Sequence, residues 1–211
     1  MSRFLRPPED LFIYYLQGRV PRDCFLQDPA FIGNWEEDGH AFLFFSRPVT
    51  SSVQDIVSRF PQLTLKDSFQ TTYEDWLGGP IGSFREDRLL IVPAWEEAPA
   101  HGPDDLLIRL NPGVVFGAGN HQTTRDCLQA LSLVLIRDRG LQSALDLGTG
   151  SGLLSLGAVR LGLERVLALD LNPLAVSTCR QNIVLNQLQD QVLAVQGRAE
   201  DFIAAEADLL L

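Results

Sequence analysis

Short aromatic and β-branched runs separated by polar turns characterise the first third of the chain. The runs that predict strands are 11–16, 31–35, 41–45 and 63–73. Residues 36–40 separate the second run from the third, so these two runs predict a hairpin. Apolar positions at helical spacing over 53–60 predict a helix, with an N-cap among the Thr-Ser-Ser residues 50–52 and an end at Pro61. We therefore predict a small α+β domain over residues 1–74.

Residues 75–110 differ from the segments on either side. Glycine and proline, which interrupt regular elements, recur through this segment around one apolar run at 89–93. We predict a structured connector that contains a hairpin.

From Thr123 onward, helical and strand patterns alternate. Predicted helices cover 123 to about 140, 153–161, 173–186 and 199–204, and predicted strands cover 144–147, 166–170, 192–195 and 208–211. The strands are almost continuously apolar, which is typical of parallel strands buried on both faces. This order predicts an α/β domain over residues 111–211, with a parallel sheet covered by helices on both faces.

A glycine-rich turn follows the first of these strands and reads Asp146-Leu-Gly148-Thr-Gly150-Ser-Gly152. Glycine lets the backbone approach a ligand closely, and the start of the next helix offers free N–H groups. The dinucleotide fingerprint, G-x-G-x-x-G, requires a glycine where Leu153 stands, so the spacing counts against NAD. Asp146 favours a cationic amino-acid ligand over a pyrophosphate, because a carboxylate repels phosphates.

Asp170 ends the second strand of the alternating region. A carboxylate at this position can accept hydrogen bonds from the ribose hydroxyls of either NAD or S-adenosylmethionine. Together with the turn, it predicts a site for a nucleoside-containing ligand. S-adenosylmethionine fits the glycine spacing better, and an NAD-linked oxidoreductase is the alternative that these residues leave open.

The bulk composition narrows the function further. Acidic residues outnumber basic ones by 27 to 17, and a net charge of -10 argues against direct nucleic-acid binding and suits a basic protein partner. The 3 cysteines and 3 histidines show no metal-ligand spacing, so we expect no metal and a reducing, cytoplasmic environment. No apolar stretch approaches the roughly 20 residues that a bilayer requires, so we expect no membrane partner.

A second glycine-rich segment, residues 111–124, surrounds the start of the helix at Thr123. Its sequence is Asn-Pro-Gly-Val-Val-Phe-Gly-Ala-Gly-Asn-His-Gln-Thr-Thr. Taken alone, this pattern predicts a flexible loop that ends in a threonine N-cap at least as well as it predicts a functional site. The segment resembles the D-P-G-x-x-F-G-T-G-x-H-x-T-T signature of the PrmA family, bacterial methyltransferases of a large-subunit ribosomal protein. Asp75-Trp76, Pro93-Ala-Trp95 and the 146–152 turn resemble the same family in the same order, so that the resemblance covers about residues 73–211.

Four positions depart from the family signature, namely Asn111, Ala118, Asn120 and Gln122. These departures bear on the substrate more than on the cofactor, so a paralogue that acts on another protein is one alternative. A small-molecule methyltransferase and a non-catalytic protein that kept the cofactor fold are the others, since a fold does not determine a function.

The resemblance implies a class I methyltransferase with a Rossmann-like parallel sheet, preceded by a small ferredoxin-like domain that recognises the substrate. The first helix of that domain must then be reduced to a turn near 23–27. Strand 208–211 corresponds to the fourth and central strand, so we expect the sheet and the acceptor-binding motif to continue beyond Leu211. The implied reaction is S-adenosylmethionine-dependent methylation of a lysine or α-amine in a ribosomal or similar protein.

The same resemblance puts Thr124, Gly148 and Asp170 at family cofactor-binding positions. The full set of cofactor-binding residues that we predict is Thr123, Thr124, Asp146, Gly148, Gly150, Gly152, Asp170, Leu171, Asn172, Ala199 and Glu200. Phe116 and His121 are candidates to shape the acceptor pocket; alternatively, Phe116 belongs to the core and His121 caps the helix. We assign no catalytic base and no metal ligand.

Overall fold

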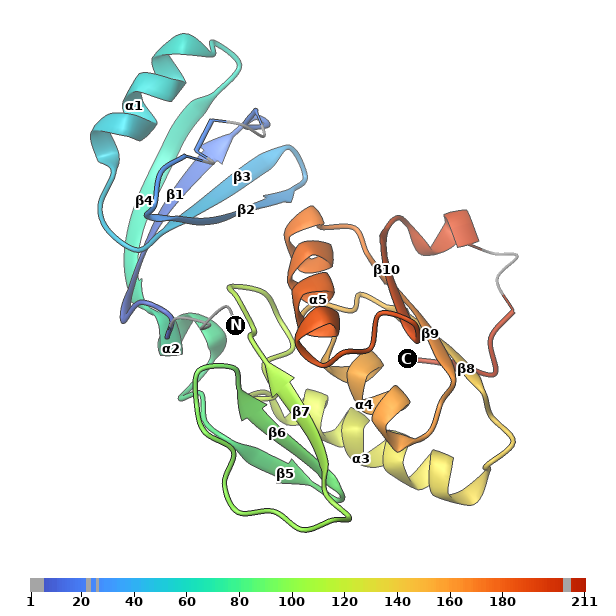
Figure 1. The fold of residues 1–211 in the computed structure, drawn as a ribbon. Coiled ribbons are helices and arrows are strands. Elements are labelled where there is room, and N and C mark those ends of the chain that lie inside the picture. The colour runs from blue at the N-terminus through green and yellow to red at the C-terminus, as the bar shows by residue number, and fades with distance from the viewer. Residues whose placement is uncertain (1–5, 22–23, 26, 203–205) are drawn as a thin grey trace. The chain divides into compact units, whose positions relative to one another are not determined.

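The computed structural model describes residues 6–21, 24–25, 27–202 and 206–211 (Figure 1). The chain divides into two compact units, one formed by Pro7–Leu77 and the other by Gly78–Leu211. Each unit buries its own cluster of apolar side chains. Within the described ranges, no helix has the length and apolar character needed to cross a membrane.

The unit Pro7–Leu77 is an antiparallel sheet with a helix packed on one face. Its elements are β1 (Asp10–Gln17), β2 (Phe31–Glu37), β3 (His40–Phe45), α1 (Thr50–Arg59), β4 (Thr64–Thr72) and α2 (Tyr73–Leu77). The strand order is β2-β3-β1-β4, and the predicted hairpin joins β2 to β3 through a turn in which Gly39 has a φ of +78°. Alternate side chains of the sheet, such as Leu16 and Leu43, meet Val53 of α1 in the buried cluster.

The start of α1 corrects one expectation. The N-cap position is Val49 rather than a residue among 50–52, and no side chain at that position caps the helix. The hydroxyl of Tyr14, on β1, instead accepts a hydrogen bond from the Val49 N–H at 2.8 Å and lies 3.1 Å from the Thr50 Oγ1. A tyrosine from the sheet therefore takes the place of a local Ser or Thr cap, which a local sequence pattern cannot reveal.

The connection from β1 to β2 contains turns in its described part. The N–H of Cys24 donates to the Pro21 carbonyl at 3.1 Å, and the N–H of Asp28 donates to the Phe25 carbonyl at 2.9 Å. Residues 23 and 26 of the expected 23–27 turn lie outside the described residues. The described elements thus follow the β-α-β-β-α-β order of a ferredoxin-like domain with turns in place of the first helix.

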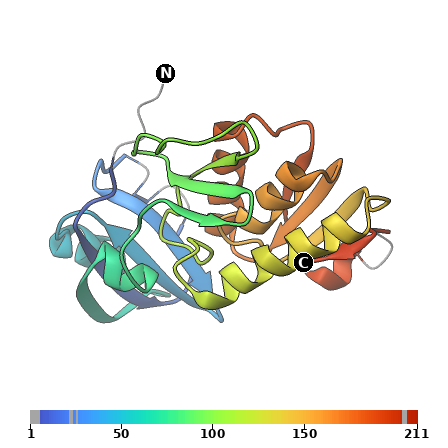
Figure 2. The ribbon, with the colours of Figure 1, turned by 90° about the horizontal axis from the view of Figure 1, so that it is seen from below.

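The unit Gly78–Leu211 combines two sheets with three long helices. Its elements are β5 (Phe84–Glu86), β6 (Leu89–Pro93), β7 (Leu106–Leu110), α3 (Gln122–Arg137), β8 (Ser143–Leu147), α4 (Leu153–Leu161), β9 (Arg165–Asp170), α5 (Pro173–Leu185), β10 (Val192–Gln196), the 3-10 helix η1 (Ala199–Phe202) and β11 (Leu209–Leu210). The larger sheet is parallel, with the order β10-β9-β8-β11. In Figure 2, α3 (yellow) runs along the near side of the unit.

The smaller sheet belongs to the same buried core as the parallel one. β5 and β6 form an antiparallel hairpin, and β7 pairs in parallel with β6. Leu89 of β6 and Ile108 of β7 are fully buried in one cluster with Leu156 of α4. The segment 75–110, expected as a connector, therefore contributes strands to the core of the unit.

Helices α4 and α5 pack on one face of the parallel sheet. That face carries Ala144 and Val166, which belong to the buried cluster. On the opposite face, Leu145 is half-buried and Leu193 is 63% exposed. Helices α4 and α5 thus cover one face, and the expectation of helices on both faces stays a prediction, because part of the connection from β10 to β11 lies outside the described residues. The crossovers that contain α4 and α5 advance in the same direction across the sheet, and right-handed connections of this kind place their helices on the same side.

Candidate cofactor site

Three parallel strands bring most of the predicted cofactor residues to one edge of the sheet. β8 leads into the turn 148–152, β9 ends at Asp170, and β10 ends at Gln196, shortly before Ala199 and Glu200. The carboxyl ends of these strands meet at the same edge because the strands run parallel and in register (Figure 1). Open α/β sheets bind their ligands at this edge.

The three glycines of the turn differ in the space around them, since one has open space beside its backbone and two are closely packed. Gly148, Gly150 and Gly152 have φ angles of +77°, +55° and +86°, which side-chain-bearing residues rarely adopt. A Cβ atom on Gly150 would meet the Phe116 carbonyl oxygen, and one on Gly152 would lie 2.6 Å from the Cys179 Sγ. A Cβ atom on Gly148 would have no neighbour within 4 Å. Gly148 therefore leaves open space beside its backbone, as the close approach of a ligand requires.

Asp170 ties the turn to the end of β9. Its Oδ2 accepts a hydrogen bond from the Gly150 N–H at 3.0 Å, and its Oδ1 accepts one from the Asn172 N–H at 2.8 Å. The side chain is only partly buried, and a carboxylate oxygen can accept more than one hydrogen bond. Asp170 can therefore shape the turn and still accept hydrogen bonds from a ribose.

The residues after Asp170 serve different purposes. Leu171 is 64% exposed and presents an apolar side chain at the carboxyl edge. Asn172 is buried, and its Oδ1 accepts a hydrogen bond from the Leu174 N–H at 2.9 Å, which caps α5. Ala199 and Glu200, in η1, are both exposed. In this structure Asn172 is thus a helix cap, whereas Leu171 is available to a ligand.

The carboxylate of Asp146 lies beneath the turn. The residue is 2% exposed, and its Oδ2 accepts hydrogen bonds from the Thr149 hydroxyl at 2.7 Å and the Ser155 hydroxyl at 2.6 Å. Burial raises the pKa of Asp146, and the hydrogen bonds from Ser155 and Thr149 act in the opposite direction. In this structure the carboxylate joins the turn to the first turn of α4.

The segment before α3 places an aromatic pair on the surface. α3 begins at Gln122 with His121 at the N-cap position, so the exposed Thr123 and the buried Thr124 lie in the first turn and neither is the N-cap. Phe116 is 56% exposed and stacks on the His121 ring, with 4.8 Å between the centroids. Phe116 is therefore not a core residue, and the His121 side chain makes no capping hydrogen bond.

Ser151 joins the two glycine-rich segments. Its N–H donates to the Phe116 carbonyl at 2.9 Å, and its hydroxyl donates to the Gly117 carbonyl at 2.7 Å. A Cβ atom on Gly117 would lie 2.9 Å from the Ser151 Oγ, so glycine allows this close approach. The segment that carries Phe116 is thus attached to the turn and is not an independent loop.

A family model described as "Ribosomal protein L11 methyltransferase (PrmA)" matches residues 72–211. The chain belongs to this family. The parallel sheet with the glycine turn at its carboxyl edge is accordingly a class I methyltransferase fold.

Curated relatives of the PrmA family carry the same description. The chain is 42% identical over 159 residues to the ribosomal protein L11 methyltransferase of Pelobacter propionicus, a match that covers 72% of the chain and 45% of that protein. It is 35% identical over 170 residues to the one of Desulfitobacterium hafniense, covering 78% of the chain and 53% of that protein. The chain thus spans about half the length of these relatives.

Among solved structures, the chain is similar to the ribosomal protein L11 methylase of Lactobacillus delbrueckii subsp. bulgaricus. The sequence identity is 33% and the TM-score is 0.44. The match covers 54% of the chain and 57% of the solved chain.

The pattern of glycines and acidic residues in the turn did not predict the buried polar residues that hold this PrmA-family site. Thr149, Ser151 and Ser155 bond within or beside the turn, and Asn182 of α5 bonds to it from outside. One signal for Asn182 was present in the sequence. Asn182 and Asn186 lie one helical turn apart in Asn-Ile-Val-Leu-Asn, and two asparagines on an apolar helix require specific partners when buried.

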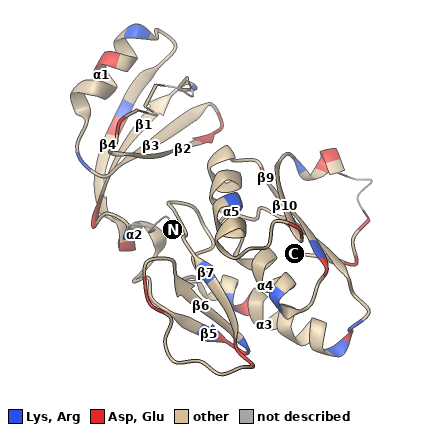
Figure 3. Ribbon diagram, in the orientation of Figure 1, with Lys and Arg blue, Asp and Glu red and all other residues tan. Residues whose placement is uncertain are grey.

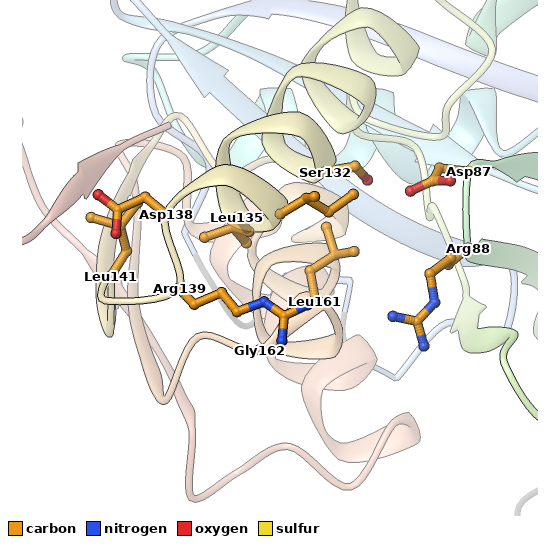
Figure 4. A pocket seen from close by; sticks show the side chains of 10 residues that line it. Asp87, Arg88, Ser132, Leu135, Asp138, Arg139, Leu141, Leu161 and Gly162 are labelled. Atoms are coloured by element: carbon orange, nitrogen blue, oxygen red, sulfur yellow. The ribbon is translucent and has the colours of Figure 1, made fainter.

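A separate pocket of about 330 Å³ lies between α3, the end of α4 and the β5–β6 turn (Figure 4). Its lining includes Arg88, Ser132 and Arg139. Leu141 and Gly162, also in the lining, come just before β8 and β9, which places the pocket at the amino edge of the sheet. It is distinct from the cofactor edge.

Among the described residues, no group of His, Cys, Asp and Glu side chains could hold a metal ion.

Proposed function

We propose that the unit Gly78–Leu211 binds S-adenosylmethionine and that the protein transfers the methyl group to an amine nitrogen of a ribosomal or similar protein. The observation that carries this proposal is the open position at Gly148 in a turn that Asp170 holds through the Gly150 N–H. Curated relatives named for methylation of a ribosomal protein support the class of substrate.

The residues at the carboxyl edge fit this cofactor. The open space at Gly148 accommodates a ligand against the backbone, and a carboxylate at Asp170 suits the two hydroxyls of a ribose. The exposed Leu171 side chain offers an apolar surface to a flat base. When bound, S-adenosylmethionine supplies a methyl group on a sulfonium, which an acceptor nitrogen in line with the carbon–sulfur bond can take.

The contribution of the protein to such a transfer is to position the acceptor and to exclude water. An acceptor lysine must first lose a proton, which near neutral pH costs roughly 4 kcal/mol for an unperturbed side chain. We propose that the stacked rings of Phe116 and His121 form one wall of the acceptor pocket, where partial desolvation lowers that cost. No residue is assigned as the base.

The charge of the chain suits a basic protein partner. Acidic residues outnumber basic ones by 27 to 17. In Figure 3 the described Lys and Arg residues are scattered over many elements and are not gathered along one. We propose that the unit Pro7–Leu77 recognises the substrate. The 3 cysteines form no disulfide, which suits the cytoplasm that we propose as the location.

Calorimetric titration of the full-length protein tests the cofactor. We expect S-adenosylhomocysteine to bind and NADH to give no heat of binding under the same conditions. Binding of NADH alone would overturn the proposal in favour of an oxidoreductase.

The acceptor is tested with a methyl-labelled cofactor in a cell lysate. We expect the label in N-methylated lysine or α-amine after acid hydrolysis of the protein fraction. Label confined to small molecules would instead indicate a small-molecule methyltransferase, and cofactor binding with no transfer would indicate a non-catalytic protein.

A further inference from the structure

Two buried asparagines, one in α5 and one at its C-cap, hold the end of β7 and the residue that follows it in the same way. Asn186 accepts a hydrogen bond from the Arg109 N–H at 2.8 Å and donates to the Arg109 carbonyl at 2.7 Å. Asn182 accepts from the Asn111 N–H at 2.8 Å and donates to the Asn111 carbonyl at 2.9 Å. Each side-chain amide therefore pairs with one residue of the extended chain as a neighbouring strand would.

The two asparagines differ in their remaining hydrogen bond. The Nδ2 of Asn186 donates to the Asn182 carbonyl at 2.8 Å, within its own helix. The Nδ2 of Asn182 donates to the Ser151 carbonyl at 2.8 Å, in the glycine turn. The Asn182 side chain thus connects α5, the glycine turn and the start of the segment 111–121, which leads from β7 to α3. The Asn186 side chain connects α5 to β7 and makes no hydrogen bond to the turn.

Ser151 extends this connection to the aromatic pair. Its N–H and hydroxyl hold the carbonyls of Phe116 and Gly117, in the middle of the 111–121 segment. The segment is therefore attached to the turn at two points, through Asn182 at Asn111 and through Ser151 at Phe116 and Gly117. Both residues are fully buried, so water cannot readily replace these hydrogen bonds.

We propose that Asn182 and Ser151 are positioning residues, which hold the wall formed by Phe116 and His121 at a set distance from the glycine turn. This inference rests on the proposed function, because it assumes that the turn holds the methyl donor and the wall faces the acceptor. Neither side chain touches the reacting atoms. Their effect is on the alignment of acceptor and donor, and small misalignments cause large losses of rate.

The test compares matched substitutions in the full-length protein. Asn182→Asp and Asn186→Asp each remove the donated hydrogen bonds of one buried amide and keep its size, but only Asn182→Asp removes a bond to the turn. We expect kcat for protein methylation to fall at least about tenfold in Asn182→Asp and to stay within about twofold of wild type in Asn186→Asp. Equal losses of kcat in the two variants would overturn the proposal.

Ser151→Ala provides the second arm, because it removes one hydroxyl and leaves the backbone hydrogen bonds of the turn. We expect its affinity for S-adenosylhomocysteine to stay within about twofold of wild type while kcat falls at least about fivefold. Unchanged kcat, or a loss accounted for by weaker cofactor binding, would contradict a positioning role. Failure of the proposed function itself gives a different result, since the wild-type protein would then show no methyl transfer.

Discussion

The chemistry of the turn depends on how deeply each carboxylate is buried. Asp170 is the last residue of β9, and Asp146 lies one residue before the end of the neighbouring β8. Of the two side chains, only that of Asp170 is partly exposed. A buried carboxyl whose pKa is raised binds its proton more tightly in the folded state than in the unfolded chain. Asp146 therefore favours folding at low pH, and this contribution is lost as the pH rises from about 3.9 through the raised pKa.

The Asp146→Asn variant tests the predicted direction of this pH dependence. The free energy of unfolding of the variant, minus that of wild type, should increase between about pH 4 and about pH 7, because the variant lacks the unfavourable ionisation. Urea titrations at a series of pH values measure it. Asp190→Asn, the same substitution at an exposed position, serves as the control. A constant difference for Asp146→Asn would show that its pKa is not raised.

Substitution of a single residue, Asp170, also tests the proposed cofactor site. Asp170→Asn loses the charge and one of the two acceptor oxygens, and we expect S-adenosylhomocysteine to bind about tenfold more weakly or worse. Calorimetry measures the change, again with Asp190→Asn as the control. An affinity within about twofold of wild type would remove Asp170 from the proposed site.

At the scale of elements, two open glycines form a matched pair, one in the turn before α4 and one at its C-cap. Gly148 precedes the helix with a φ of +77°, Gly162 follows it with a φ of +123°, and a Cβ on either would have no neighbour within 4 Å. Substitution of each by alanine should lower stability by about 1 to 2 kcal/mol through backbone strain. Only Gly148→Ala should also abolish binding of S-adenosylhomocysteine, because its methyl group enters the proposed site. Equal binding by both variants would refute this placement.

The Tyr14 hydroxyl at the start of α1 carries a prediction for the smaller unit. Tyr14→Phe leaves the Val49 N–H without its acceptor, and we expect the free energy of opening of α1 to fall by about 1 kcal/mol. Amide hydrogen exchange at Val49 and in the first turn of α1 measures it. Thr50→Ala keeps the Tyr14 hydroxyl and should cause a smaller loss. A larger loss in Thr50→Ala would restore the cap that the sequence predicted.

Local sequence patterns predicted the helices, strands and turns well, but they predicted the contacts between these elements poorly. The Gly148–Gly152 turn and the strand that ends at Asp170 follow from glycine chemistry and apolar runs, which are local properties. The cap of α1 depends on Tyr14, and the 111–121 segment depends on Ser151, so both are determined by residues distant in sequence. The placement of α4 and α5 on the same face follows from the direction of their crossovers, which periodicity does not encode.

At the scale of the whole molecule, the proposed cofactor edge and the unit proposed to recognise the substrate belong to separate parts of the chain. Gly78–Leu211 carries the turn and Asp170, and Pro7–Leu77 is the unit that we propose to recognise the substrate. The family match covers residues 72–211, so the cofactor unit has the stronger support from relatives. The two roles therefore need an assay in which both are required at once.

Methyl transfer from labelled S-adenosylmethionine into ribosomal proteins is that assay. The full-length protein and its Gly148→Ala and Gly162→Ala variants are each incubated with isolated ribosomal proteins, which are then separated by size. The account predicts a labelled protein with wild type and with Gly162→Ala, and none with Gly148→Ala. No labelled protein with wild type, or equal labelling by Gly148→Ala, would contradict it.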